Sequence, residues 1–101
     1  MTYDEYAAHD GLGLAELVRR GEVSAAELAR ISQSAIDALN PQLNAVITPL
    51  FEKARAQAAG PVPAGPFSGV PFLLKDLSAH SEGDPFHEGM RFLKERGIGV
   101  L

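Results

Sequence analysis

A lysine stands at the end of a continuous apolar run. The run Gly-Val-Pro-Phe-Leu-Leu extends from Gly69 to Leu74, and Lys75 and Asp76 follow it. Burial favours the neutral form of an amine, and a neutral amine can take a proton from a serine hydroxyl, directly or through a second hydroxyl. The serine oxygen can then attack a carbonyl carbon. Composition alone favours a strand-end lysine with its head in water, so these residues make Lys75 only a candidate base for acyl transfer.

The other side chains with catalytic or ligating potential do not form a second site. His9, His80 and His87 show no pair at metal-ligand spacing and no neighbouring acidic cluster, so solvated or hydrogen-bonding roles fit them better. Ser78 could form a local pair with Lys75, but a plain turn serine is far commoner at such a place. We therefore predict no metal.

The overall composition predicts a soluble protein with a hydrophobic core. Apolar residues make up 46% of the 101 residues, and the net charge of −4 argues against a nucleic-acid or anionic-membrane partner. The absence of cysteine excludes disulfides and thiolate chemistry. The segment Met1–Tyr6 is acidic where a secretory signal would be basic, and no apolar run reaches the length of a membrane span. We expect a cytoplasmic protein.

The first 60 residues carry helical patterns. Asp10 is placed to cap a helix that Gly21 stops. A second helix is predicted after Ser24, the first residue of a capping box, and it should end at Asn40-Pro41. The apolar face of this second helix consists of Leu28, Ile31, Ala35 and Leu39.

Shorter elements are predicted on either side of residue 50. Residues 43–47 are partly β-branched and favour a strand or an extended segment. Residues 51–59 are rich in alanine and favour a helix that Gly60-Pro61 must end. Residues 61–66 form a stiff connector, because proline fixes its own φ and restricts the residue before it.

The lysine lies in the segment that follows the connector. Residues 70–74 are apolar throughout, the pattern of a strand buried on both faces of a parallel or mixed sheet, and residues 88–96 favour a helix. The predicted fold class is α/β. We expect one incomplete domain, in which residues 1–60 are helical, residues 61–66 form the connector, and residues 67–101 hold the lysine strand with its following helix.

Three segments resemble the amidase signature family in its order and approximate spacing. The run Gly-Val-Pro-Phe-Leu-Leu-Lys-Asp-Leu at 69–77 resembles the strand that carries the family's catalytic lysine. Residues 14–19 and 21–28 resemble the paired N-terminal helices of bacterial amidases, and residues 39–47 resemble their connection into the first strand. This resemblance reverses the assessment of Lys75 and favours a catalytic origin for it.

The resemblance implies an amide hydrolase with a Ser/cis-Ser/Lys triad and no cofactor. Lys75 would be the base, and the small-molecule substrate would be cleaved to a carboxylate and ammonia or an amine. The implied fold has two N-terminal helices, then short strands of a mixed sheet with flanking helices. The family's two serines lie in a downstream Gly/Ser-rich segment, and no Gly-Gly-Ser-Ser-Gly-like stretch occurs in 1–101. We therefore expect roughly the first fifth of such an enzyme, inactive alone.

Departures from the family pattern leave alternatives open. Gly89-Met90 stands where the family usually has Gly-Ser, and the ending Ile98–Leu101 fits a frameshifted, truncated or miscalled reading frame. Within the family, the alternative is the amidase subunit of a tRNA-dependent amidotransferase, which would add protein and tRNA partners; the pair Leu73-Leu74 looks more like a free-standing amidase. A different class is a non-catalytic interaction module. A homo-oligomer is equally open.

Overall fold

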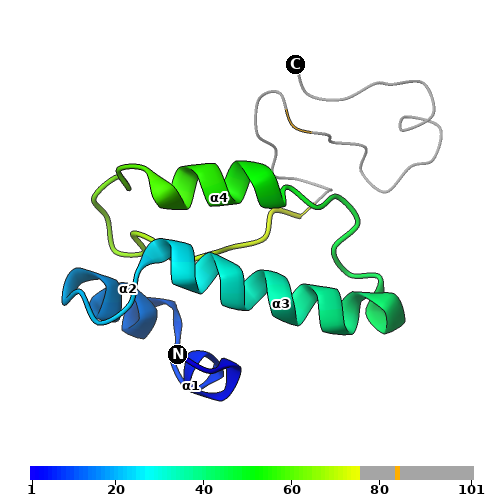
Figure 1. The fold of residues 1–101 in the computed structure, drawn as a ribbon, viewed down its shortest axis with the longest axis horizontal. Helices are drawn as coiled ribbons and strands as arrows, with labels where there is room; N and C mark the ends of the chain where they lie inside the picture. Colours follow the sequence, from blue (N-terminus) through cyan, green and yellow to red (C-terminus); the bar gives the residue numbers. More distant parts are fainter. Residues whose placement is uncertain (76–83, 85–101) are drawn as a thin grey trace. The chain divides into compact units, whose positions relative to one another are not determined.

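The computed structural model describes residues 1–75 and Asp84 (Figure 1). The chain divides into two units, Met1–Pro71 and Phe72–Leu101. The first unit contains the helices α1 (Tyr3–Ala7), α2 (Gly11–Arg19), α3 (Ala25–Leu43) and α4 (Phe51–Ala59). α3 packs against α1 and α4. Among the described residues there is no strand, so the expected sheet is not seen in them. None of the helices in this region is long and apolar enough to cross a membrane.

Helix α1 was not predicted, although its signal is present in the sequence. Thr2 and Glu5 form a capping box: the Glu5 backbone N–H donates to Thr2 Oγ1 at 3.2 Å, and the Thr2 N–H donates to Glu5 Oε1 at 3.1 Å. Two of the helix's unpaired N–H groups are thereby satisfied. The spacing Thr-x-x-Glu predicts such a cap. Here the cap starts a helix, although that helix is short.

Helix α2 has the predicted start and stop. The Asp10 carboxylate accepts from the Gly13 N–H at 2.7 Å. At the other end Gly21 adopts a φ of +74°, which glycine reaches without steric cost. The Gly21 N–H donates to Val18 O and the Glu22 N–H to Leu17 O, both at 3.0 Å. These two bonds form a Schellman motif, which turns the chain directly into α3.

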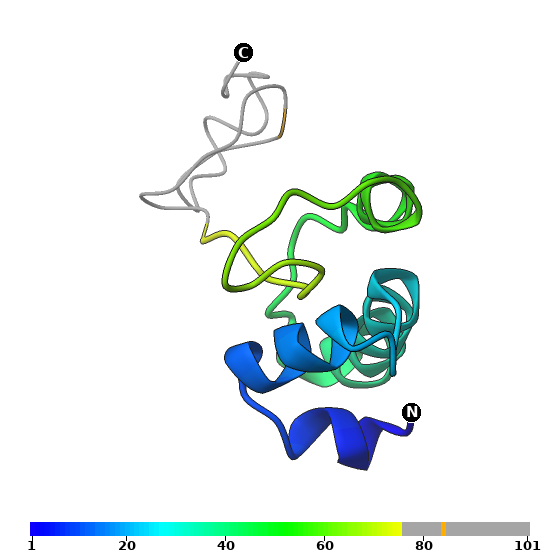
Figure 2. The same ribbon diagram turned by 90° about the vertical axis from the view of Figure 1, so that its left-hand side faces the viewer.

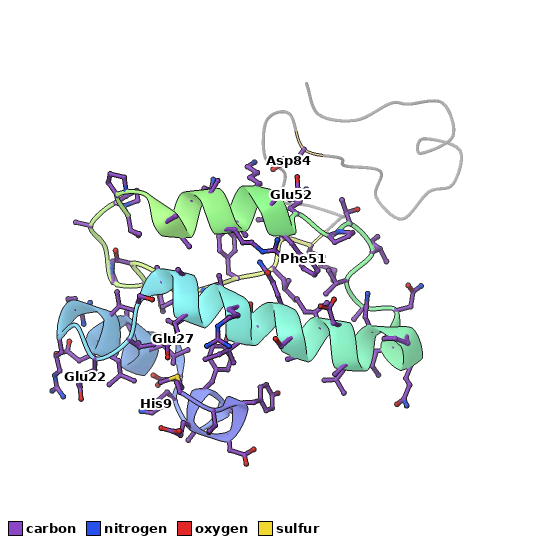
Figure 3. All side chains as sticks on the ribbon, in the orientation of Figure 1. His9, Glu22, Glu27, Phe51, Glu52 and Asp84 are labelled. Carbon is purple, nitrogen blue, oxygen red and sulfur yellow. The ribbon has the colours of Figure 1, made fainter. Side chains whose placement is uncertain are left out.

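The start of α3 was predicted correctly, but its end was not. Ser24 Oγ accepts from the Glu27 N–H at 3.1 Å, as in a capping box. The Glu27 side chain pairs instead with the terminal ammonium of Met1, at 3.0 Å (Figure 3). The helix continues through Pro41, whose missing N–H removes one bond in the last turn. It ends at Asn44, which has φ +49° and whose N–H donates to Asn40 O at 2.7 Å.

Of the two predictions for 43–47, a strand or an extended segment, the strand is wrong. Leu43 is the last residue of α3, and the next residues are irregular. The side-chain amide of Asn40 donates to Val46 O at 2.8 Å and accepts from the Val46 N–H at 3.0 Å. One side chain therefore occupies both backbone groups that Val46 would need for a strand ladder.

The strand predicted at 70–74 is not seen among the residues described. Phe72, Leu73 and Leu74 are irregular, and their exposed fractions are 77%, 69% and 48%. A strand needs a neighbour that takes up its N–H and C=O groups, and the described residues supply none. Pro71 also has no N–H to donate. The predicted helix at 88–96, with His80, His87, Ser78 and Asp76, lies outside the described residues.

Helix α4 has the predicted bounds and ends at Gly60. The core of the unit lies where α2 turns into α3. It consists of the buried side chains Leu14, Val23 and Leu28, with Met1, Tyr6, Leu17, Val18 and Val70 packed against them. Leu28 is fully buried, so its whole side chain contributes to the burial energy of this core.

Replacing Leu28 by alanine should destabilise the helical unit. The change removes a fully buried side chain, and such cavities cost about 2–5 kcal/mol. Leu12→Ala is the matched control, because Leu12 is 53% exposed on α2. Urea unfolding followed by circular dichroism at the helical band should show a lower midpoint for Leu28→Ala and an almost unchanged one for Leu12→Ala. Equal midpoints would contradict this packing.

The cap of α1 should depend on pH. Hydrogen bonds from the Thr2 backbone and hydroxyl hold the pKa of Glu5 below its ordinary value of 4.5. Because the folded pKa is the lower one, the stabilisation is present above pH 4.5 and is lost as pH falls through the folded value. An NMR titration of the Glu5 carboxyl carbon should have its midpoint below 4.5, and Thr2→Ala should move it upward. A midpoint above 4.5 would show that the cap does not form in solution.

Candidate functional site

Lys75, the predicted catalytic residue, lies in the unit that begins at Phe72. Its side chain is exposed, and it follows the exposed side chains of Phe72, Leu73 and Leu74. Among the described residues none forms an ion pair with it. The structure therefore presents the lysine as an accessible amine that follows an uncovered apolar segment.

The chain reaches this segment through a tight turn that belongs to the helical unit. The Ser68 N–H donates to Gly65 O at 3.3 Å, and the Val70 N–H donates to Phe67 O at 3.1 Å. The Ser68 hydroxyl donates to Pro63 O at 2.7 Å. To act as a nucleophile, Ser68 would have to give its hydroxyl proton to a base. The Pro63 carbonyl oxygen accepts the hydrogen bond but cannot take the proton, so Ser68 has a structural role here.

Gly69 brings this turn into close contact with the corner between α2 and α3. Its φ is +83°. A Cβ placed on it would lie 3.1 Å from Val18 Cγ1 and 3.3 Å from Ala25 Cβ, closer than ordinary van der Waals contact. Val70, the next residue, packs against the core. In Figure 2 the segment that follows α4 passes on the side of α2 away from α1.

A second glycine allows the same turn to approach the start of α2. A Cβ on Gly11 would lie 3.1 Å from Cδ1 and Cε1 of Phe67. The turn therefore touches α2 near both of its ends, at Gly11 and at Val18. The sequence suggested neither contact, because each depends on where residues about 50 positions apart meet.

The link between α3 and α4 was also missed by the sequence analysis. Gln33 is buried on α3; its Nε2 donates to Phe51 O at 3.4 Å, and its Oε1 accepts from Arg55 Nε at 3.0 Å. Figure 3 shows Phe51 at the side of α4 that faces α3. The available signal was the spacing of Gln33 from Ala25 and Ala29, which places the three residues on one helical face.

The other polar clusters of the helical unit are structural. Glu16 pairs with Arg19 and with Arg20, and the neighbouring guanidinium of Arg19 lowers the pKa of Glu16. These exposed pairs contribute little to stability. His9 Nδ1 lies 2.8 Å from Glu5 O. Within 1–75 and Asp84, no three His, Asp or Glu side chains gather as metal ligands would.

The serines of the helical unit are mostly engaged by the backbone. Ser24 caps α3, Ser32 donates to Ala29 O at 3.1 Å, and Ser68 donates to Pro63 O. A lysine base needs a hydroxyl within hydrogen-bond reach before it can promote acyl transfer. The described residues thus supply a candidate base and no assembled nucleophile.

Comparison with known proteins identifies homologues of much greater length. The chain is 48% identical over 88 residues to the 6-aminohexanoate-cyclic-dimer hydrolase of Paenarthrobacter ureafaciens. The matched stretch is 87% of this chain and 17% of that relative. It is 38% identical over 96 residues to the lipoamidase of Enterococcus faecalis, which is 94% of this chain and 13% of the relative. It is 41% identical over 93 residues to the A subunit of the glutamyl-tRNA(Gln) amidotransferase of Granulibacter bethesdensis, which is 86% of this chain and 17% of the relative.

These relatives belong to the amidase signature family, as the sequence segments had indicated. The chain spans less than a fifth of the length of each of them. No family model matches the chain. No solved structure matches it either. The chain is thus homologous to a short stretch of amidase signature enzymes.

Removing the Gln33 amide should loosen α4. Gln33→Ala leaves Arg55 without this partner and breaks the hydrogen bond to Phe51 O. The free energy of unfolding should fall by about 1–3 kcal/mol. Native-state hydrogen exchange should therefore speed up about tenfold or more in α4, with a smaller change near Leu28. Gln57→Ala, on the exposed side of α4, is the control and should leave these rates almost unchanged. Equal rates in the two variants would exclude Gln33 as the link.

Proposed function

We propose that this chain is a portion of an amidase signature enzyme that hydrolyses carboxamides, and that Lys75 is its general base. The observation that carries the proposal is the run at 69–77 within a region of 48% identity to an amide-hydrolysing relative. A match of 88 residues in a chain of 101 must include residues 14–88, and therefore Lys75.

In the proposed reaction the neutral Lys75 amine accepts a proton from the middle serine, which takes one from the nucleophilic serine. The nucleophilic oxygen attacks the amide carbon, and the C–N bond breaks as the departing amine takes up a proton. Water then hydrolyses the acyl-enzyme to the carboxylate. Both serines and the oxyanion donors come from polypeptide outside these 101 residues, because 1–101 contains no Gly/Ser-rich segment of that type.

The exposure of the residues just before Lys75 supports the proposal that the serines come from further polypeptide. Phe72, Leu73 and Leu74 are consecutive large apolar side chains that the described residues leave uncovered. Covering them would contribute about 25 cal/mol for each Å² of apolar surface. A sheet formed with further polypeptide would do this and would also pair the backbone groups, which is the α/β fold that we propose for the whole enzyme.

A second candidate is the amidase subunit of a tRNA-dependent amidotransferase. It is favoured by the identity of 41% to the relative from Granulibacter bethesdensis. The hydrolase match has higher identity over a similar length, and a net charge of −4 makes this chain a poor contact for tRNA by itself. We therefore place the hydrolase first, with a small amide as substrate.

The test is a chimera in which this chain's matched residues replace the corresponding 88 of the Paenarthrobacter ureafaciens hydrolase. It should hydrolyse the 6-aminohexanoate cyclic dimer. Lys75→Met should lower kcat by about 10²–10⁴-fold, the usual contribution of a positioned base. Lys53→Met, at an exposed lysine on α4, is the control and should leave kcat unchanged.

Equal activity of the Lys75→Met and Lys53→Met chimeras would contradict the assignment of Lys75. The isolated chain gives a second check, because it should release no amine from an amide above background. Turnover by the isolated chain that Lys75→Ala abolishes would show that the catalytic set is already present in 1–101.

A further inference from the structure

The peptide bond between Asp10 and Gly11, at the start of α2, joins two residues that can react with each other. The backbone nitrogen after an aspartate can attack the side-chain carboxyl carbon, because this attack closes a five-membered ring. Glycine has no Cβ that would hinder the attack, so the ring forms most readily where glycine follows the aspartate. Asp10 is exposed, and water can therefore reach the ring once it has formed.

The packing of α2 favours glycine at this position. A Cβ on Gly11 would lie 3.1 Å from Cδ1 and Cε1 of Phe67, closer than ordinary van der Waals contact. A larger residue would shield the backbone nitrogen, but it would also displace the Phe67 ring. The contact with Phe67 thus favours the residue that leaves this nitrogen unshielded.

Two hydrogen bonds hold Asp10 away from the geometry of ring closure. Asp10 Oδ1 accepts from the Gly13 N–H at 2.7 Å, and Asp10 O accepts from the Leu14 N–H at 3.0 Å. Closure needs the Gly11 nitrogen eclipsed with Asp10 Cβ about the Cα–C bond, whereas the ψ of 179° leaves them staggered. Rotation about this bond turns the Asp10 carbonyl away from Leu14, and rotation of the side chain breaks the bond to Gly13. Ring closure therefore requires the first turn of α2 to open.

We propose that Asp10–Gly11 is a site of spontaneous isoaspartate formation, and that the first turn of α2 controls its rate. When the turn opens, the Gly11 nitrogen forms a bond to Asp10 Cγ, and the hydroxyl of the protonated carboxyl leaves with the amide proton as water. Water then adds to a carbonyl of the cyclic imide. Addition at the original main-chain carbonyl breaks its bond to nitrogen, so the chain runs through Cβ and a free carboxylate remains on Cα.

The product has no N-cap of the original kind. Its backbone has one more atom between Asp10 and Gly11, and its carboxylate is attached directly to Cα, away from the place where Oδ1 meets the Gly13 N–H. The buried Leu14 lies in the same first turn. Isomerisation should therefore make α2 less stable, an effect that does not depend on the proposed hydrolysis.

The site is tested by keeping the 101-residue chain in neutral buffer, with and without urea, and then measuring isoaspartate in its proteolytic peptides by enzymatic methylation. In urea, isoaspartate should accumulate faster at Asp10 than at Asp4 or Asp37, because residues with a side chain follow these two. Without urea, the rate at Asp10 should be lower than in urea. No isoaspartate at Asp10 in urea, or no preference for Asp10, would overturn the site.

The control by the first turn is tested with variants of Gly13. Gly13→Pro removes the N–H that binds Asp10 Oδ1, at a helix position that tolerates proline, and should raise the rate in buffer about 2- to 30-fold, as loss of an N-cap does. Gly13→Ala is the matched control, because it adds a Cβ but keeps the N–H. Equal rates in these two variants, or equal rates of the native chain with and without urea, would overturn this control. Circular dichroism shows whether Gly13→Pro folds; if it does not, the urea comparison decides.

The consequence for stability is measured with Asp10→Ser. Serine keeps a capping oxygen but has no carboxyl carbon that could form the ring. After long incubation, the midpoint of urea unfolding should fall in the native chain and stay constant in Asp10→Ser. An equal fall in both would show that isomerisation at Asp10 does not destabilise α2.

Discussion

The close contact between the Gly69 backbone and the corner of α2 and α3 is the constraint on which the rest of this structure depends. It requires a corner of defined shape, which the Gly21 turn and the buried Leu28 provide. It also requires small groups at the point of contact, and this is why a glycine meets an alanine, Ala25, there.

The local features of the fold were predictable from the sequence because they depend on a few neighbouring residues. Asp10 and Ser24 cap their helices through N–H groups three residues away, and Gly21 ends α2 because it can adopt positive φ. Such interactions do not depend on where distant segments of the chain lie. The Thr2 cap belongs to the same class and was overlooked.

The features that could not be predicted depend on contacts between distant or unexpected partners. The Asn40 amide occupies the backbone of Val46 and removes the predicted strand. Gln33 reaches Phe51 across 18 positions. For the candidate site, the sequence predicted Lys75 but not the close contact at Gly69, because the φ and the neighbours of that glycine are tertiary properties. The predicted sheet is not seen within 1–75, and a strand's stability comes from its partners.

The incompleteness of the site and the exposure of its apolar segment have one common explanation. The chain spans 17%, 13% and 17% of the three relatives cited above, and in the proposed enzyme both serines of the triad come from polypeptide outside the 101 residues. The helical unit has its own core, but the lysine segment does not. In the proposed enzyme, catalysis therefore requires the surface that covers Phe72–Leu74.

The most direct test is a crystal structure of the chimeric hydrolase, which can show what surrounds Lys75 once further polypeptide is present. We predict that Lys75 Nζ lies about 2.6–3.2 Å from a serine hydroxyl, the reach of a working base, and that Phe72–Leu74 are paired and covered. A Lys75 side chain that remains in solvent, with no serine hydroxyl in reach, would contradict the assignment of Lys75 as the base.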